Sequence, residues 1–154
     1  MKAGLLRLGM NLWSPFRGAG IYVRRIAPDY REIQVELSLK WHNRNYIGTH
    51  FGGSLYAMTD PFYMLMLIHA LGPEYVVSHK AGAIEYLLAT GEKVYARFSL
   101  DDATVADIKA QTASGEKYLP QMAVEVRNAA GDVVARVLHT LYVRKKRGKV
   151  GDTA

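Results

Sequence analysis

Two glycines and a carboxylate lie in and just before the most apolar segment of the chain. Gly52 and Gly53 precede a run that is almost entirely apolar over residues 55–71, and Asp60 is the only acidic residue within that run. Backbone N–H groups at a helix start can bind a negative charge that develops on oxygen, and glycines allow close approach. A carboxylate can activate water or attack a carbonyl directly. These residues are therefore candidate catalytic groups for hydrolysis at a carbonyl carbon, with Asp60 as general base or nucleophile.

Each of these residues also has a structural interpretation. Asp60 precedes Pro61, and such a pair starts helices well because aspartate caps the first turn and proline is tolerated at the first helical position. Proline also disfavours a helical residue before it, so Asp60 could simply restart a broken helix. Gly52 and Gly53 could form a tight turn and nothing more. The sequence leaves these alternatives open.

The elements that must position these groups follow from the periodicity of the chain. A buried helix is expected over residues 53–71, and the polar residues 42–53 form the loop that leads into it. Strict alternation of apolar and polar residues over 33–41 predicts a half-buried strand, and residues 21–26 predict another. Beyond Gly72 and Pro73, the pattern predicts strands over 75–88 and 93–100 joined as a hairpin, a helix over 101–113 capped by Asp101 or Asp102, and strands over 118–127 and 133–144.

Grouped strands with few helices predict an α+β fold with a largely antiparallel sheet. A helix that is hydrophobic nearly all round must be covered on most sides, and one curved sheet covers it only in part. Pairing with a second copy is therefore expected. At 154 residues the chain is expected to be a single domain, 1–154, which begins with a short amphipathic helix or lid over residues 1–14 and ends in a basic, disordered tail over 145–154.

Composition narrows the compartment and the cofactors. The chain has no cysteine, which excludes a disulfide framework and a cysteine nucleophile, and no metal or redox cofactor is expected. The first residues lack the features of a secretory signal, so a cytoplasmic location is expected. A membrane span over the apolar run is disfavoured because a carboxylate at mid-membrane is costly. Part of the net charge of +6 lies in the tail, which is interpreted as a solvated end rather than a nucleic-acid contact.

Residues 45–60, with the sequence NYIGTHFGGSLYAMTD, resemble the loop and central helix of the hotdog thioesterase superfamily, particularly its phenylacetate-type acyl-CoA thioesterases. More closely, the chain from Trp13 to about Val143 is similar to a bacterial hotdog family of unknown function (DUF4442-like). The resemblance implies a hotdog fold, in which a curved antiparallel sheet wraps around a long central helix. It also implies a hydrolase of acyl thioesters, with CoA only as part of the substrate, that acts as a homodimer or tetramer.

The resemblance bears on three further residues, Asn45, His50 and Ser78, and a fourth candidate, Lys80, comes from its place on the strand beside Ser78. Counted back from the second glycine, Asn45 matches a family asparagine, whereas one extra residue separates His50 from the glycine pair and displaces that histidine. Ser78 approximates a position where some of these enzymes carry Ser or Thr, and Lys80 beside it could meet a carboxylate or a phosphate. Structural alternatives are an asparagine that bonds its own loop, a histidine that anchors the loop, and an exposed strand lysine.

The distance between the candidate groups points to a shared site. At 1.5 Å per residue, Asp60 lies about 10 Å along an ideal helix axis from Gly53, too far for both to hold one small thioester. In the resembling enzymes the carboxylate of one chain faces the glycine loop of the other, and the same arrangement at a dimer interface is expected here. The alternative is a non-catalytic hotdog module that binds an acyl or CoA-like ligand or assembles with partners.

Overall fold

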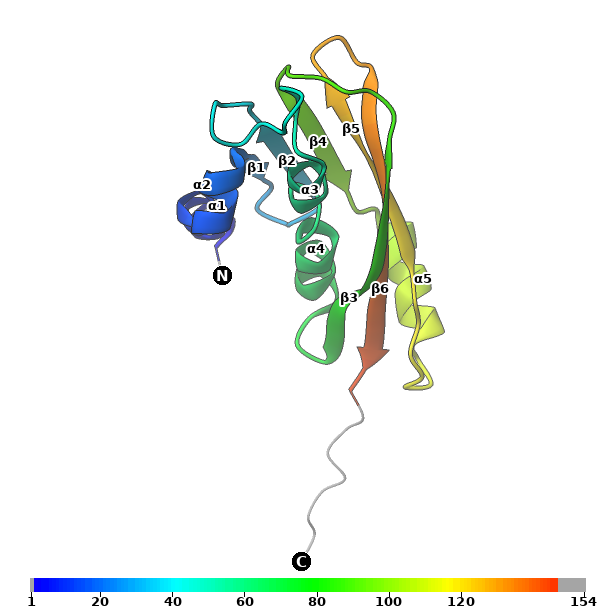
Figure 1. Cartoon of the computed structure of the whole chain (residues 1–154). Coiled ribbons are helices and arrows are strands. Elements are labelled where there is room, and N and C mark those ends of the chain that lie inside the picture. Colours follow the sequence, from blue (N-terminus) through cyan, green and yellow to red (C-terminus); the bar gives the residue numbers. More distant parts are fainter. Residues whose placement is uncertain (1, 147–154) are drawn as a thin grey trace, which may run out of the picture.

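A single antiparallel sheet organises the chain in the computed structural model, which describes residues 2–146 (Figure 1). The strand order is β1-β2-β4-β5-β6-β3, and every neighbouring pair is antiparallel. This is the α+β class that the grouped strands predicted. The elements in chain order are α1 (Ala3–Leu12), α2 (Ser14–Ala19), β1 (Ile21–Ile26), β2 (Glu32–Leu37), α3 (Gly52–Ala57), α4 (Phe62–Leu71), β3 (Tyr75–Tyr86), β4 (Val94–Ser99), α5 (Asp102–Gln111), β5 (Gln121–Asn128) and β6 (Val133–Lys145).

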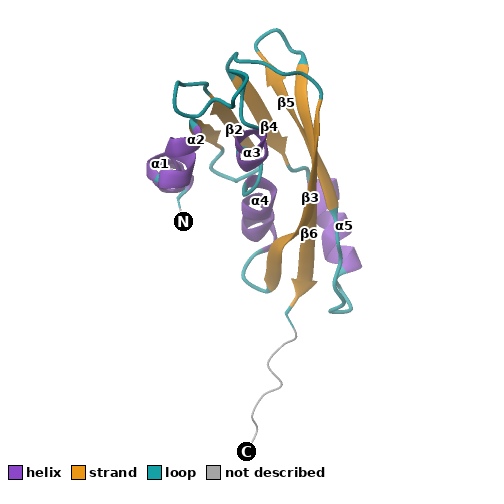
Figure 2. Ribbon diagram, in the orientation of Figure 1, coloured by secondary structure: helices purple, strands orange, loops and turns teal. Residues whose placement is uncertain are grey.

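The core lies between the sheet and the two helices α3 and α4, which follow each other across its curved inner face (Figure 2). Phe62 and Met66 of α4 are fully buried, and the ring of Phe62 lies 4.9 Å from that of Phe98 on β4. The apolar members of the alternating strands supply the other wall, because successive strand side chains point to opposite faces. The curved sheet and its inner helices are consistent with the hotdog fold that the sequence resemblance implied.

The expected continuous helix over residues 53–71 is wrong. The chain forms α3 and α4 with a turn at residues 58–61 between them. Pro61 has no N–H to donate, and the turn tightens so that the Thr59 and Asp60 amides bond three residues back, to Tyr56 and Ala57. Pro61 itself is the N-cap of α4, and no side chain caps that helix. Asp60 therefore sits in the break but does not cap the second helix.

The expected hairpin between the third and fourth strands is also wrong. β3 pairs with β6 at the edge of the sheet, whereas β4 lies between β2 and β5. The connecting residues 87–93 are held by contacts that a two-strand hairpin would not make: Leu87 and Leu88 donate backbone hydrogen bonds to Val134, and Thr90 accepts one from His50. The β3–β6 ladder runs along the whole of Tyr75–Tyr86, so pairing between strands distant in the sequence prevails over pairing between neighbours.

The remaining predicted elements are confirmed with shifted ends. The predicted strand over 33–41 stops at Leu37, and Trp41 is 83% exposed. Asp101 is the N-cap of α5, where its carboxylate accepts a hydrogen bond from the Thr104 amide. The N-terminal helix is present and is followed by α2. The tail does not begin at 145, because Lys145 ends β6 and Lys146 bonds to Glu74 and Pro73; the rest of that prediction lies outside the described residues.

Among residues 2–146, every helix falls short of the length and apolar character that a membrane-spanning segment requires.

Candidate functional site

A buried hydrogen bond connects the break between α3 and α4 to the sheet. His139 on β6 is 0% exposed, and its Nε2 lies 3.1 Å from Oγ1 of Thr59. Thr59 donates its one hydroxyl hydrogen to the Tyr56 carbonyl, at 2.8 Å, so it must accept from His139. The proton of the neutral imidazole therefore resides on Nε2. This bond holds the residue next to Asp60 against β6.

The other imidazole nitrogen of His139 has no hydrogen-bond partner within residues 2–146. The same is true of Nε2 of His79 on β3, and the two rings lie 5.4 Å apart. The pKa of His139 is lowered to about 4, chiefly by burial and also by the nearby His79, while the charge of Asp60 partly opposes both effects. His139 is therefore neutral at physiological pH and acts as a hydrogen-bond donor, not as a cation.

Asp60 lies close enough to His139 for its charge to act on that imidazole. Its side chain is half-buried, and within the described residues no hydrogen bond or ion pair engages its carboxylate. Burial raises the pKa of Tyr56, and the charge of Asp60 raises it too, which places this carboxylate near the phenol as well as near His139. An unpaired carboxylate in a partly buried position is free to accept a proton from water or to attack an electrophile.

Tyr56 completes the cluster from α3. Its hydroxyl lies over Gly82 on β3 so closely that a β-carbon on Gly82 would collide with it. Gly82 is paired with His139 across the β3–β6 ladder, so the glycine and the histidine share one level of the sheet. The glycine is needed here because the phenol occupies the space of a side chain.

The loop before α3 uses its polar side chains internally. The amide of Asn45 donates to Oγ1 of Thr49 and to the His50 carbonyl, and its oxygen accepts from the amides of Ile47 and Thr49. These four bonds exhaust what one amide side chain can make. His50 is buried, and its Nε2 donates to the Glu92 carbonyl at 2.7 Å. The structural alternatives given for Asn45 and His50 account for these contacts, and their functional roles stay predictions.

Gly52 and Gly53 begin α3, and the first helical amide to find a carbonyl partner is that of Ser54. Gly52 lines a cleft of about 310 Å³ together with Asn45 and His50 from the loop and with Tyr86 from the end of β3. A β-carbon on Gly52 would stand 2.8 Å from the Tyr86 hydroxyl. Asp60 does not line this cleft. Within one chain, the structure therefore brings the loop candidates together but keeps the carboxylate apart from them.

Ser78 and Lys80 are exposed on β3, which is the edge strand of the sheet. The β3–β6 register shifts between His79 and Ala81, so Lys80 occupies a bulge. Neither residue lines the cleft of Gly52. Their predicted substrate-binding role would need a partner, such as a second copy of the chain, that contributes side chains at this edge of the sheet.

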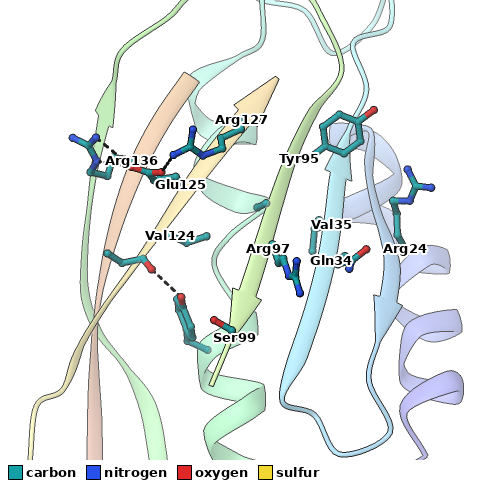
Figure 3. A pocket seen from close by; sticks show the side chains of 13 residues that line it. Arg24, Gln34, Val35, Tyr95, Arg97, Ser99, Val124, Glu125, Arg127 and Arg136 are labelled. Carbon is teal, nitrogen blue, oxygen red and sulfur yellow. Dashed lines mark hydrogen bonds and ion pairs between the residues drawn. The ribbon is translucent and has the colours of Figure 1, made fainter. Parts of the chain in front are cut away.

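A larger cleft of about 820 Å³ opens where β4 and β5 separate, and it contains none of the seven candidate residues (Figure 3). The β4–β5 ladder ends at Ala96. The gap is closed from the helix side by Tyr63, whose hydroxyl donates to the Ala123 carbonyl at 2.8 Å. Arg127 and Arg136 converge on Glu125, and their hydrogen bonds lower the pKa of that carboxyl. The two arginines thus favour the ionised form of the Glu125 carboxyl, and a carboxylate held in that form is a poor proton donor near neutral pH.

Sequence reasoning missed His139, Thr59 and Tyr56. A signal for His139 was present in the sequence. Val137, His139 and Leu141 are alternate residues of one strand and share its buried face, where a polar residue is unusual. Nothing local indicated which element it would face. The other two residues lie in the apolar run and look like ordinary core positions.

Several solved structures share the fold of this chain. A protein of unknown function from Pseudomonas aeruginosa, named a probable thioesterase, has a TM-score of 0.82 at 13% identity, over 94% of this chain and 97% of that one. A Haemophilus influenzae thioesterase has a TM-score of 0.68 at 15% identity over 98% and 96%. Zebra fish thioesterase superfamily member 2 has 0.63 at 18% over 92% and 98%. These likenesses show the fold alone.

Among curated proteins, none matches this chain. A family model matches residues 2–143, which is nearly the whole chain. The chain therefore belongs to the family described as a domain of unknown function, DUF4442.

Proposed function

We propose that this protein hydrolyses acyl thioesters of the acyl-CoA type as a homodimer, with Asp60 as the reactive carboxylate. The observation that carries the proposal is the position of Asp60, half-buried in the break between α3 and α4 and without a hydrogen-bond or ion-pair partner among residues 2–146. The fold shared with proteins named thioesterases supports the choice of substrate class. The His139–Thr59 bond supports a fixed position for the carboxylate.

The proposed reaction balances with the groups of this chain. The Asp60 carboxylate takes a proton from water while the water oxygen bonds to the thioester carbon. The carbonyl oxygen gains the negative charge, which the amides of Gly52 and Gly53 stabilise. When the carbonyl re-forms, the carbon–sulfur bond breaks and the thiolate takes the proton from Asp60. The products are a carboxylic acid and a thiol. Direct attack by Asp60, with an anhydride intermediate, is the second form of the mechanism.

The proposal includes a second copy because Asp60 does not line the cleft that contains Gly52. The edge strand β3 supports such pairing: residues 78 and 80–83 are exposed, and they include Ala81, Gly82 and Ala83. An unpaired edge with small side chains can accept another strand. In the proposed dimer, the carboxylate of one protomer faces the glycine amides of its partner.

Substitution of the carboxylate tests the enzyme. Asp60→Asn should lower kcat on acyl-CoA substrates by about a hundredfold or more while the melting temperature stays close to that of the wild type. Asp29→Asn, in the turn between β1 and β2, is the matched control and should keep full activity. A wild-type protein that is inactive on short, medium, long and aromatic acyl-CoAs would refute the proposal.

Mixing of two inactive variants tests the shared site. Asp60→Asn and Gly52→Val each damage a different half, and Tyr86 is exposed enough to move away from the new side chain. After subunit exchange, half of the dimers are mixed, and each mixed dimer holds one intact site. About one quarter of wild-type activity should return. If both halves belong to one chain, mixing restores nothing.

A binding module is the second candidate, favoured by the loop contacts that occupy Asn45 and His50. It predicts that an acyl-CoA binds equally well to the wild type and to Asp60→Asn, with no turnover in either form. Calorimetric titration alongside thiol release separates the two functions.

A further inference from the structure

Helix α1 carries a row of leucines that points away from the protein. Leu5, Leu8 and Leu12 are 62%, 56% and 61% exposed, and Trp13, just after the helix, is 53% exposed. At 100° per residue these three leucines fall within a narrow stripe of the helix. A groove of about 410 Å³, almost entirely apolar, lies beside the tryptophan. Single exposed leucines are common, but a contiguous apolar face marks a contact surface.

The helix cannot turn this face inward, because its opposite side is bonded to β1. The side-chain amide of Asn11 donates to the Val23 carbonyl at 3.0 Å and accepts from the Val23 amide at 2.7 Å. Arg7 donates to the Arg24 carbonyl at 2.9 Å. Met10 is buried on this side. In Figure 1, α1 accordingly lies at the outer edge of the molecule, beyond β1.

The charged residues of the N-terminal segment itself are all basic. No acidic residue occurs before Asp29, while the same stretch holds five basic residues, Lys2, Arg7, Arg17, Arg24 and Arg25. Arg24 and Arg25 pair with glutamates of β2. Lys2, Arg7 and Arg17 are exposed and belong to the two N-terminal helices or their caps.

We propose that α1 is an interfacial anchor that binds an anionic lipid bilayer, with Leu5, Leu8, Leu12 and Trp13 inserted among the lipids. Leucines on one face and cations around them are the composition of helices that lie in a membrane interface, and tryptophan favours the headgroup level. A second copy of the chain fits this face less well. Symmetric pairing through α1 would bring the cations of Lys2, Arg7 and Arg17 from both protomers together. The anchor does not depend on the proposed hydrolase activity.

Vesicle binding by the full chain tests the anchor. The probes are vesicles of phosphatidylcholine alone and of phosphatidylcholine with phosphatidylglycerol. In the Trp41→Phe variant, Trp13 is the only tryptophan, so its emission reports on this surface. We expect co-sedimentation with the anionic vesicles, a blue shift of Trp13 emission, and weaker binding as salt rises.

Charge placed on the stripe gives the decisive comparison. Leu8→Glu should weaken binding to anionic vesicles by about tenfold or more, because one leucine leaves the lipid and an anion replaces it. Leu119→Glu is the matched control, since Leu119 is 40% exposed ahead of β5, and it should bind like the wild type. Equal melting temperatures would show that both variants fold.

Three results would overturn the anchor. They are absence of binding to either vesicle, equal binding by Leu8→Glu and the wild type, and a wild-type dimer that Leu8→Glu dissociates in solution without any effect on vesicles. The last result would assign the face to a second copy.

Discussion

The imidazole of His139 donates a buried hydrogen bond to the hydroxyl of Thr59, the residue that precedes Asp60. The bond joins the centre of β6 to the turn at residues 58–61, where Pro61 interrupts the helix, and it limits how that turn can move. Without this hydrogen bond, the turn would hold the Asp60 carboxylate in a less fixed position. The pair therefore gives His139 a positioning role for the proposed reaction, and this role can be measured.

Removal of the donor should slow the reaction. His139→Leu should lower kcat by about tenfold, the equivalent of one net hydrogen bond, with little change in KM. His139→Gln offers a donor at a similar reach and should recover much of the rate. If both variants keep the wild-type kcat, His139 has no positioning role.

Acid should destabilise the fold through His139. Its folded pKa of about 4 lies below the unfolded value near 6.5, so the unfolded chain binds the proton first. The contribution is complete above about pH 6.5 and is lost as the pH falls toward 4, to a total of roughly 3 kcal/mol. Urea unfolding at several pH values measures it. His139→Gln should flatten this slope, whereas His42→Gln, at an exposed position, should leave it unchanged.

A methyl group at Gly82 should disturb the packing of Tyr56. Gly82→Ala places a β-carbon against the phenol and should cost about 1–3 kcal/mol of unfolding free energy. Addition of Tyr56→Phe should recover part of the loss, since the hydroxyl is the nearest obstacle, and a double-mutant cycle measures this coupling. Gly9→Ala is the control: its β-carbon meets nothing within 4 Å in a helix, so it should stabilise slightly. Additive effects of the Gly82 and Tyr56 substitutions would contradict the prediction.

Loss of the Tyr63 hydroxyl should lower the free energy of unfolding, because this hydroxyl bonds to β5 where β4 and β5 separate. Tyr63→Phe leaves the Ala123 carbonyl without its donor and should cost about 1 kcal/mol. Tyr95→Phe removes a hydroxyl from the same cleft where no hydrogen bond forms between described residues, and it should be nearly neutral. Denaturant midpoints of the two variants decide the case; equal midpoints would mean that the bond contributes nothing.

Much of the fold could be predicted because its signals are local. The alternation in β2 and β6 follows directly from which side chains a strand buries, and the cap at Asp101 needs only the three residues after it. The Asp60–Pro61 pair also indicated a possible break in the helix, since proline cannot donate the amide hydrogen bond that a continuous helix requires. The break between α3 and α4 was thus foreseeable as an alternative, although its turn geometry was not.

The sequence by itself determined the strand periods and the presence of a lone carboxylate within an apolar run, and it indicated the helix break only as an alternative. Tertiary structure alone decided that β3 pairs with β6 rather than with β4, because strand pairing depends on long-range burial that adjacent residues do not encode. It also brought His139 into contact with Thr59, 80 residues away in the sequence. The side-chain amide of Asn45 makes its hydrogen bonds within its own loop. Contacts of this kind depend on where whole elements pack, so the environment of Asp60 emerged only from the folded chain.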